Sequence, residues 1–326
     1  MNNKILLIGA GQLGSRHLQA LAQLTEPTII YVIDPNSESL NLAKSRFEEV
    51  KGSELHQCNC ISNIDEVKDT EVEVSIIATN SAIRAAVVKE LLSKLKTKFL
   101  ILEKFLFQRI LDYVEISNLL ETNNVTGFVN CPRRMFQSYI QIKSILNQHE
   151  PVRMEVIGNE WGLACNSVHF IDLFHFLSKS KVKSWENSLV KGYVESKRKG
   201  YIEFFGSLES KTGSQDHISI SCFPSGKVNT SVRISTPSVR FIVNESLGNV
   251  VKEIIEDNQI ITSEQPFEMA YQSGLTNIVV EELISYGKCS LTPYQESMDI
   301  HIPFLKTMIE HYNKDLEVKT DLCPIT

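Results

Sequence analysis

Two titratable residues stand three positions apart in an otherwise apolar stretch of the sequence, LACNSVHFID at residues 163–172. If this stretch is one helix, His169 and Asp172 lie on the same face of it. The apolar residues around them indicate that the helix is buried. Because histidine titrates near neutral pH, it can accept and release protons in a reaction. We therefore treat this pair as a candidate for catalysis.

A second candidate site is the glycine-rich segment after the first apolar run. Residues 4–8 read KILLI and residues 9–14 read GAGQLG, so a short strand precedes a G-x-G-x-x-G motif and a helical stretch at 13–24. The first glycine allows a tight turn, the second lets a diphosphate approach the backbone, and the third lets the helix pack on the sheet. The diphosphate would lie on N–H groups at the helix N-terminus. The expected dinucleotide contacts here are Gly9, Gly11, Gln12, Leu13 and Gly14.

An acidic residue, Asp34, ends the second apolar run at residues 28–33 and follows Gly14 by twenty positions. A carboxylate at this place accepts hydrogen bonds from the ribose hydroxyls of a bound dinucleotide. It also repels the 2′-phosphate of NADP, and the following residues 35–37 include no arginine that would bind such a phosphate. The sequence therefore predicts NAD rather than NADP as the cofactor.

Strand-like and helix-like segments continue to alternate beyond Asp34. Residues 72–78 and 99–102 read as strands, whereas 40–50 and 83–95 read as helices. This alternation predicts a doubly wound parallel sheet, in which ligands bind beyond the carboxyl ends of the strands. We expect one crevice there, and Asn80 should also contact the cofactor. The residues at these strand ends are Gly9, Asp34, Thr79, Glu103 and Lys104.

The composition limits the class of protein. A chain of 326 residues suggests two domains, and a net charge of −6 without a basic run argues against nucleic-acid or membrane partners. The N-terminus does not read as a signal peptide, and no apolar stretch is long enough to span a bilayer. The seven cysteines show no spacing typical of a metal site. We expect a cytoplasmic protein with reduced thiols and no metal.

The second half of the sequence has a different pattern of apolar and polar residues. Residues 152–156, 217–222 and 228–234 alternate apolar with polar side chains, as strands of a half-buried antiparallel sheet do. We place a dinucleotide-binding domain at 1–124 and a substrate-binding and oligomerisation domain at 125–326. Residues 179–199 should form a mobile, charged connection. Pro303 should kink or end the C-terminal helix.

These features resemble the glucose–fructose oxidoreductase, inositol dehydrogenase and MocA (Gfo/Idh/MocA) family of NAD(P)-dependent oxidoreductases over nearly the whole chain. The segments that carry the resemblance are GAGQLGSRH at 9–17, EK at 103–104, NCPRRMF at 130–136, HFID at 169–172, RKGYIEFFG at 198–206 and TPYQES at 292–297. The resemblance implies an N-terminal Rossmann domain and a C-terminal α+β domain with a large, open, mostly antiparallel sheet. It also implies a homodimer or homotetramer that pairs through this sheet.

The resemblance assigns roles to particular residues. Lys104 matches the family's active-site lysine and His169 its active-site histidine, which makes them a proton-transfer pair. From the residues themselves, we expect Asn166 to orient the substrate hydroxyl. We expect Asp172 to support the histidine from one helical turn away and to belong to the substrate site as well. Trp161 could stack on a sugar ring or anchor the core. Arg133 or Arg134 could bind an anionic group of the substrate or form an ion pair.

The sequence also departs from the family pattern. Phe105 replaces the proline that usually follows the active-site lysine. Because a non-proline cis bond costs about 3 kcal/mol, we expect the Lys104–Phe105 bond to be trans or the backbone there to be strained. Cys165 occupies the place of an acid that family members often carry four residues before the histidine. Arg84 replaces a histidine, and Asn80 replaces a proline.

The function that these residues favour is NAD-dependent hydride transfer between nicotinamide and a secondary alcohol or ketone. The substrate would be a small polyhydroxylated molecule, namely a sugar, nucleotide sugar, sugar acid or cyclitol. One alternative is an enzyme that retains its NAD and catalyses redox-neutral epimerisation or elimination of a sugar. Another is a non-catalytic regulatory protein that is controlled by dinucleotide binding.

Overall fold

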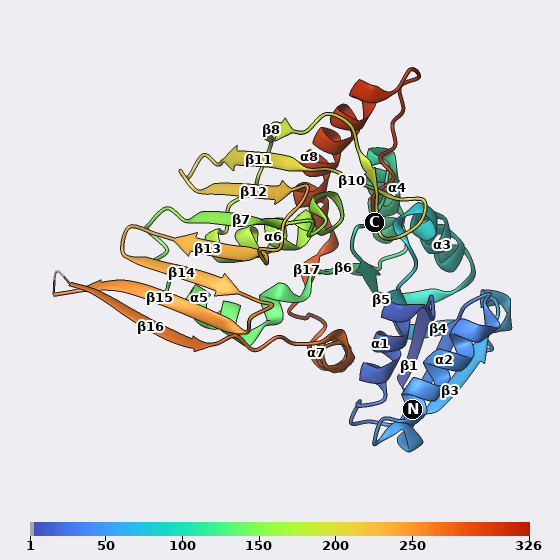
Figure 1. The fold of residues 1–326 in the computed structure, drawn as a ribbon. Coiled ribbons are helices and arrows are strands. Elements are labelled where there is room, and N and C mark those ends of the chain that lie inside the picture. The colour runs from blue at the N-terminus through green and yellow to red at the C-terminus, as the bar shows by residue number, and fades with distance from the viewer. Residues whose placement is uncertain (1–2, 258) are drawn as a thin grey trace. The chain divides into compact units, whose positions relative to one another are not determined.

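The computed structural model describes residues 3–257 and 259–326, which form two compact units (Figure 1). The first unit contains the chain up to Phe107, Leu111–Pro132 and Ala270–Glu296, and the second contains Gln108–Ile110, Arg133–Met269 and Ser297–Thr326. This division differs from the predicted one at 124/125, because a late segment of the chain returns to the first unit. The apolar pattern of that segment indicates burial but not the sheet on which it packs.

A seven-stranded sheet forms the centre of the first unit, with strand order β17-β6-β5-β4-β1-β2-β3. All neighbouring strands are parallel except β17, which is antiparallel to β6. This order confirms the expected doubly wound Rossmann fold. The strands are β1 (Asn3–Ile8), β2 (Thr28–Ile33), β3 (Gln57–Ile61), β4 (Glu71–Ile77), β5 (Lys96–Glu103), β6 (Thr126–Asn130) and β17 (Thr292–Pro293).

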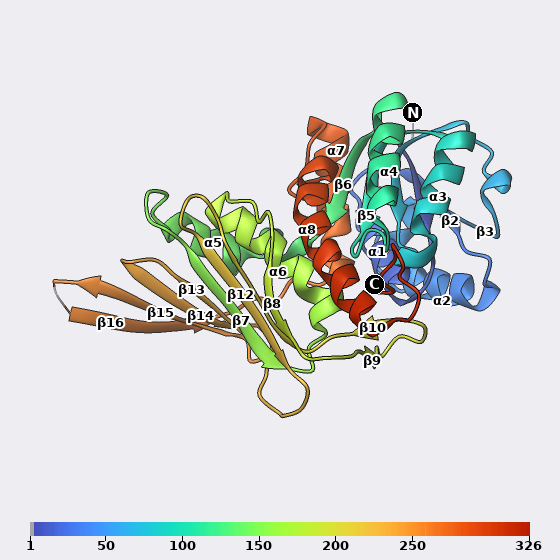
Figure 2. The ribbon, with the colours of Figure 1, turned by 90° about the horizontal axis from the view of Figure 1, so that it is seen from above.

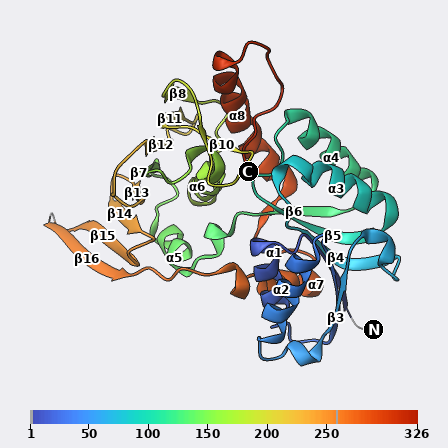
Figure 3. The same ribbon diagram turned by 45° about the vertical axis from the view of Figure 1, so that its right-hand side comes forward.

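Helices cover both faces of this sheet, with α1 and α2 on one side and α3 and α4 on the other (Figure 3). The helices are α1 (Gln12–Leu21), α2 (Ser37–Glu48), α3 (Ser81–Lys94), α4 (Ile110–Thr122) and α7 (Thr276–Tyr286). Central strands that are buried on both faces read as continuous apolar runs, and for this reason β1, β2, β4 and β5 were predictable. Strand β3, QCNCI, has no such run and was not predicted.

The second unit contains an eight-stranded sheet with strand order β16-β15-β14-β13-β7-β12-β11-β8. Its neighbouring strands are antiparallel except for the parallel pair β7 and β12. Along β7, Met154, Val156 and Gly158 are buried and alternate with exposed residues, which confirms the period-two prediction. The strands are β7 (Arg153–Asn159), β8 (Glu186–Leu189), β11 (Gly206–Lys211), β12 (His217–Phe223), β13 (Ser231–Ser235), β14 (Val239–Asn244), β15 (Asn249–Glu256) and β16 (Gln259–Pro266).

Two helices, α5 (Gln137–Ile145) and α6 (Leu163–Ser178), lie against one face of this sheet (Figure 2). The expected mobile connection at 179–199 is wrong in part, because it contains β8 and also β9 (Val194–Glu195), which pairs with β10 (Ile202–Glu203). Pro303 does not end its helix, since α8 runs from Tyr294 to Tyr312. Buried side chains on either side of it, Ile300 and Phe304, stabilise the helix despite the missing donor.

Among the residues that the structure describes, no helix has the length and apolar character needed to cross a membrane.

Candidate functional site

The glycine turn has the shape that a dinucleotide diphosphate requires. Gly9 has a φ of 98°, and a Cβ on Gly14 would lie 1.8 Å from the Gly9 carbonyl oxygen. A Cβ on Gly11 would meet nothing within 4 Å, so the backbone there faces open space. Helix α1 begins at Gln12 without a side-chain cap on its first amides. Gly9 and Gly14 therefore pack the turn, whereas Gly11 leaves room for a ligand at a helix N-terminus.

Asp34 follows β2 and is connected to the glycine turn. Its Oδ2 accepts a hydrogen bond from the Ala10 amide at 2.7 Å, and its Oδ1 accepts one from the Asn36 amide at 2.8 Å. A carboxylate oxygen can accept more than one hydrogen bond, so this side chain keeps acceptor capacity. An acid thus lies beside the glycine turn, and its chemistry suits ribose hydroxyls.

Arg84, which replaces a family histidine, connects the ends of two neighbouring strands. Its buried guanidinium donates to the carbonyl oxygens of Thr79, Phe105 and Leu106, the last at 2.9 Å. Asn80 caps α3, because its Oδ1 accepts from the amides of Ala82 and Ile83 at 3.1 and 3.3 Å. These contacts position the loops after β4 and β5, which carry Thr79 and Lys104.

The peptide bond between Lys104 and Phe105 is cis, so of the two expected alternatives the trans bond is wrong. The prediction used only the intrinsic preference of the bond. In the folded chain the Phe105 side chain is completely buried and its carbonyl is bound by Arg84. These contacts come from residues that lie far from the motif in the sequence, and they could not be read from the motif itself.

Glu103 belongs to a closed ring of buried hydrogen bonds. Its Oε1 accepts from His17 Nε2 at 2.9 Å and from Asn130, and Asn130 also donates to Gln272 at 2.8 Å. Gln272 and His17 each bind the Thr276 hydroxyl at 2.8 Å, which closes the ring. Burial alone would raise the pKa of Glu103, but the hydrogen bond and charge of His17 hold it below its usual value.

This ring changes the interpretation of Glu103, for which we expected a cofactor contact. With 3% of its surface exposed, the side chain fixes the end of β5, immediately before Lys104, and offers little surface to a ligand. His17 was predictable as a buried residue, since it follows Gly14 by one helical spacing on α1. Gln272 and Thr276 gave no signal in the sequence.

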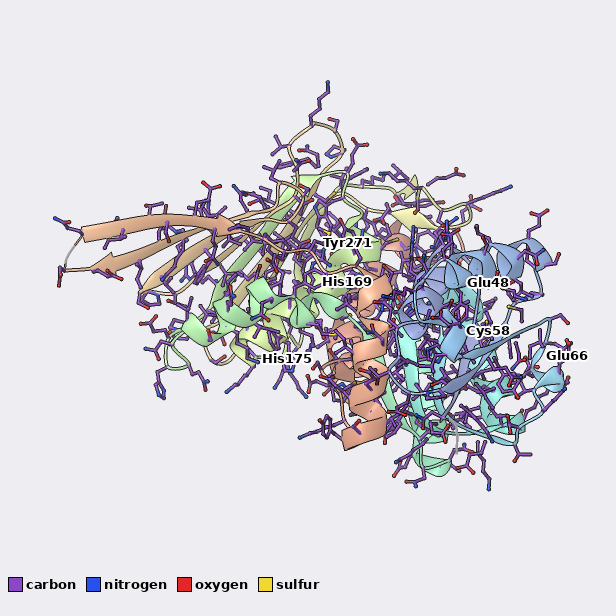
Figure 4. The ribbon with its side chains drawn as sticks, turned by 90° about the horizontal axis from the view of Figure 1, so that it is seen from below. Glu48, Cys58, Glu66, His169, His175 and Tyr271 are labelled. Atoms are coloured by element: carbon purple, nitrogen blue, oxygen red, sulfur yellow. The ribbon has the colours of Figure 1, made fainter. Side chains whose placement is uncertain are left out.

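A pocket of about 560 Å³ lies within the second unit, between α6 and the loops at one end of its sheet. Four of the six residues predicted to contact substrate line it, namely Arg133, Trp161, Asn166 and His169. The last two lie on α6, one helical spacing apart; His169 is labelled in Figure 4. The wall also includes Lys227, Glu245 and other polar residues. A concave site with convergent polar groups and an aromatic ring is typical of a small-molecule site.

The aromatic and amide groups of this pocket are held in place by backbone contacts. The Trp161 indole donates to the Ser221 carbonyl oxygen at 2.9 Å, and its ring lies edge-on to Phe170 at 5.5 Å. Asn166 Nδ2 donates to the Trp161 carbonyl oxygen at 2.8 Å. Trp161 thus anchors the local structure and also lines the pocket, so both readings of it have support.

Arg133 forms the ion pair that we considered as one of its two roles. Its Nε and Nη2 each donate to Glu245 at 2.8 Å, and its guanidinium lies 4.3 Å from the centre of the Phe170 ring. Tyr139 also donates to Glu245, at 2.7 Å. Burial, followed by the Glu245 carboxylate, raises the pKa of Tyr139 well above its usual value. Glu245 is therefore a pocket residue that no sequence pattern indicated.

Asp172 forms a buried ion pair with Arg134. Its carboxylate accepts two hydrogen bonds from Arg134, at 2.9 and 3.0 Å, and only 1% of the side chain is exposed. Asp172 is not among the residues that line the pocket. The predicted substrate contact therefore requires correction, because the carboxylate points to an arginine on a neighbouring segment and the ion pair buries it.

An acid from another strand reaches the first turn of α6. Glu203 accepts from the amides of Ala164 at 2.7 Å and Cys165 at 3.2 Å. A negative charge at the N-terminal end of a helix interacts favourably with the helix dipole and stabilises the helix. The helix thus has an acid near Cys165, where the family often carries one, but it comes from β10. No local pattern connected Glu203 with this helix.

Residues 3–131 match the Gfo/Idh/MocA family model, described as the oxidoreductase family with an NAD-binding Rossmann fold, so the resemblance inferred from the sequence is confirmed for this part of the chain. No curated protein matches the chain. Among solved structures, an oxidoreductase from Agrobacterium radiobacter in complex with NAD+, L-tartaric acid and magnesium has a TM-score of 0.72 at 14% identity, with 96% of each chain covered.

Two further structures share the fold. The UDP-N-acetylglucosamine 3-dehydrogenase from Acidithiobacillus ferrooxidans has a TM-score of 0.71 at 12% identity, and the match covers 94% of this chain and 96% of that one. A super-repressor mutant of Gal80p from Saccharomyces cerevisiae has a TM-score of 0.75 at 12% identity, with 96% of each chain covered. At these identities the likeness establishes the fold of both units.

Proposed function

We propose that this chain, whose residues 3–131 match the model of an NAD-binding oxidoreductase family, oxidises a secondary alcohol or reduces the corresponding ketone of a small polyhydroxylated substrate. The observation that carries the proposal is the pocket of the second unit, in which Arg133, Trp161, Asn166 and His169 converge. Hydroxyl-bearing substrates need this combination of donors, acceptors and an apolar ring face. A sugar, nucleotide sugar, sugar acid or cyclitol is the expected class.

The residues at the glycine turn fit NAD. Gly9, Gly11 and Gly14 with the first amides of α1 would hold the diphosphate, and Asp34 would bind the ribose hydroxyls. The open space at Gly11 and the acid beside the turn support this assignment, and the acid favours NAD over NADP. When bound, the nicotinamide supplies the hydride acceptor or donor.

In this proposal the chain manages the proton of the reacting hydroxyl. His169 can take or return a proton near neutral pH, and Asn166 on the same helix face can orient the hydroxyl. Lys104 would polarise the carbonyl oxygen or share the proton. The Glu103 ring and the Arg84 contacts hold both sides of the Lys104 backbone, so the lysine is well fixed for such a task.

Steady-state kinetics with a panel of sugars, sugar acids, nucleotide sugars and inositols would test the proposal. We expect NADH formation with at least one substrate and a loss of about 100-fold or more in kcat for His169→Ala and Lys104→Ala. His217→Ala on β12 and Lys98→Ala on β5 are matched controls and should keep wild-type turnover. If both active-site variants also keep wild-type turnover, the mechanism is wrong.

Two alternative functions predict different results for the same purified protein. A redox-neutral enzyme would retain NAD through purification and convert its substrate without releasing NADH. A regulatory protein controlled by the dinucleotide would bind NADH and turn over no member of the panel. The ordered pocket with His169 favours an enzyme over this second alternative.

Pairing of two copies through the exposed face of the eight-stranded sheet belongs to the same proposal. Ile157 and Phe223 lie on neighbouring strands of this face and are 46% and 50% exposed. A contiguous exposed apolar patch rimmed by polar residues marks an interaction site, and we propose that these two side chains belong to such a patch. Light scattering should give a dimer or tetramer for the wild type and a smaller species for Ile157→Asp, and an unchanged mass would contradict this surface.

A further inference from the structure

Two cysteines in the first unit have a geometry that the proposed reaction does not use. Cys58 and Cys60 alternate with Asn59 on β3, so their thiols project from the same face of the strand. Strand β3 is at the edge of the sheet, beyond β2, and both cysteines are half-buried. The two thiols are therefore neighbours on this face of the strand.

The surroundings distinguish the two thiols. The hydrogen bond from Cys58 lowers the pKa of Cys60 to about 7, since it outweighs burial, and the Lys44 ammonium on α2 acts in the same direction. The same hydrogen bond, together with burial, raises the pKa of Cys58. Glu48, also on α2, opposes ionisation of both (Figure 4 labels Glu48 and Cys58). At neutral pH a thiolate thus lies beside a thiol.

This pair is also close, along the backbone, to the predicted cofactor site. Cys60 is opposite Val32 of β2, and the carbonyl of the next residue, Ile61, accepts the Asp34 amide at 3.3 Å. The Asp34 carboxylate in turn binds the Ala10 amide in the glycine turn. A displacement of β3 at Cys60 would therefore act on the residue that we assign to the ribose.

We propose that Cys60 and Cys58 form a peroxide-sensitive dithiol whose oxidation weakens dinucleotide binding. The Cys60 thiolate attacks one oxygen of hydrogen peroxide, so that the S–O bond forms, the O–O bond breaks and hydroxide leaves. The Cys58 thiol then attacks the sulfenic sulfur, and an S–S bond forms while the hydroxyl leaves with the thiol proton as water. Two electrons pass from the sulfur atoms to the peroxide in total.

The strand geometry explains why oxidation would affect binding. Two residues of an extended strand span about 6.6 Å, whereas disulfide-bonded residues usually have Cα atoms about 5.5–6 Å apart. The disulfide would therefore draw the strand together locally and move the Ile61 carbonyl. An edge strand can move in this way because it has a neighbour on one side only. The coupling to binding rests on the proposed function, but the oxidation itself does not.

The oxidation can be tested on the full-length protein by treatment with hydrogen peroxide, alkylation and mass spectrometry. We expect the peptide with Cys58 and Cys60 to lose two hydrogens faster than Cys289, another half-buried cysteine, is oxidised. Cys58→Ser should accumulate a sulfenic acid at Cys60 that reacts with dimedone, whereas Cys60→Ser should abolish the reaction. Equal oxidation of Cys289, or an unchanged rate in Cys60→Ser, would overturn the proposal.

The coupling is measured by NADH fluorescence titration before and after oxidation. We expect the Kd for NADH to rise about tenfold in the oxidised protein, to return to its original value with dithiothreitol, and to stay unchanged in peroxide-treated Cys60→Ser. Cys289→Ser is the control that should behave as wild type. If the disulfide forms but the Kd for NADH does not change, the coupling to dinucleotide binding is wrong and the oxidation itself is not. Failure of the reduced protein to bind NADH contradicts the coupling together with the proposed cofactor, and the mass spectrum still decides the oxidation.

Discussion

The buried ion pair between Arg134 and Asp172 allows a quantitative test of the packing in the second unit. The two side chains are 10% and 1% exposed and share two hydrogen bonds. Removal of one partner of a buried pair costs about 3–5 kcal/mol of stability, because the remaining charge stays desolvated. Arg134→Met leaves the more deeply buried carboxylate without this partner, so we expect it to cost more than Asp172→Asn.

The double variant Arg134→Met/Asp172→Leu separates the pair from its surroundings. Replacement of both charges by apolar groups of similar volume is often close to neutral. The double variant should therefore be more stable than the sum of the single changes Arg134→Met and Asp172→Leu implies, with a coupling energy of about 1–3 kcal/mol. Arg233→Gln provides a matched control, since its pair with Glu155 is about half exposed and worth no more than about 1 kcal/mol.

Urea unfolding followed by tryptophan fluorescence is the appropriate assay. The chain has two tryptophans, Trp161 and Trp185, and both belong to the second unit, so their emission reports this unit alone. A loss of 3 kcal/mol should lower the urea midpoint by about 1–3 M. If Asp172→Asn lowers the midpoint no more than Arg233→Gln does, the pair is not the buried, coupled interaction that we infer.

Three further predictions concern the first unit. Gly14→Ala should destabilise this unit and abolish NADH binding, because its Cβ would lie 1.8 Å from the Gly9 carbonyl oxygen. Gly11→Ala should keep the stability measured by thermal unfolding but lose NADH binding in a fluorescence titration, because the added Cβ meets no protein atom within 4 Å and enters the space assigned to the diphosphate. The pKa of Glu103 in the folded protein is below its usual 4.5, so the unfolded chain binds more protons near that pH. The ionised Glu103 side chain therefore stabilises the fold above pH 4.5, and this contribution to the free energy of unfolding is lost as the pH falls through the folded-state pKa. Glu103→Gln should flatten this part of the curve of melting temperature against pH, and an unchanged curve would contradict the assignment. Wild-type protein should bind NADH about tenfold or more tightly than NADPH, a difference of about 1.4 kcal/mol, and Asp34→Ser should reduce this ratio; tighter binding of NADPH would contradict our reading of Asp34.

The parts of the fold that follow from local patterns were predictable. The apolar runs at β1, β2, β4 and β5, the glycine turn and the acid after β2 all depend on residues that are adjacent in the chain. The helix that carries His169 was predictable for the same reason. Strand β3 was not, because an edge strand with cysteines and polar residues has neither a continuous apolar run nor a clear alternation.

The partners of the charged residues could not be predicted, because they lie in distant parts of the sequence. Glu245 is 112 positions from Arg133, and Asp172 is 38 positions from Arg134. Sequence spacing on one helix suggested that Asp172 supports His169, but a residue on a buried helix also faces other segments. The tertiary structure assigned the carboxylate to an arginine, because a charge at 1% exposure needs a partner of opposite charge.

Local sequence patterns were sufficient to predict the Rossmann strands, the turn for a diphosphate and the acid beside it, since turn geometry and strand burial depend on neighbouring residues. Three other features became apparent in the folded chain alone: segment 270–296 completes the first unit, Glu203 caps α6, and Arg84 connects the loops after β4 and β5. These contacts join residues that are distant in the chain, and the need to satisfy buried polar groups selects them only once the chain has folded.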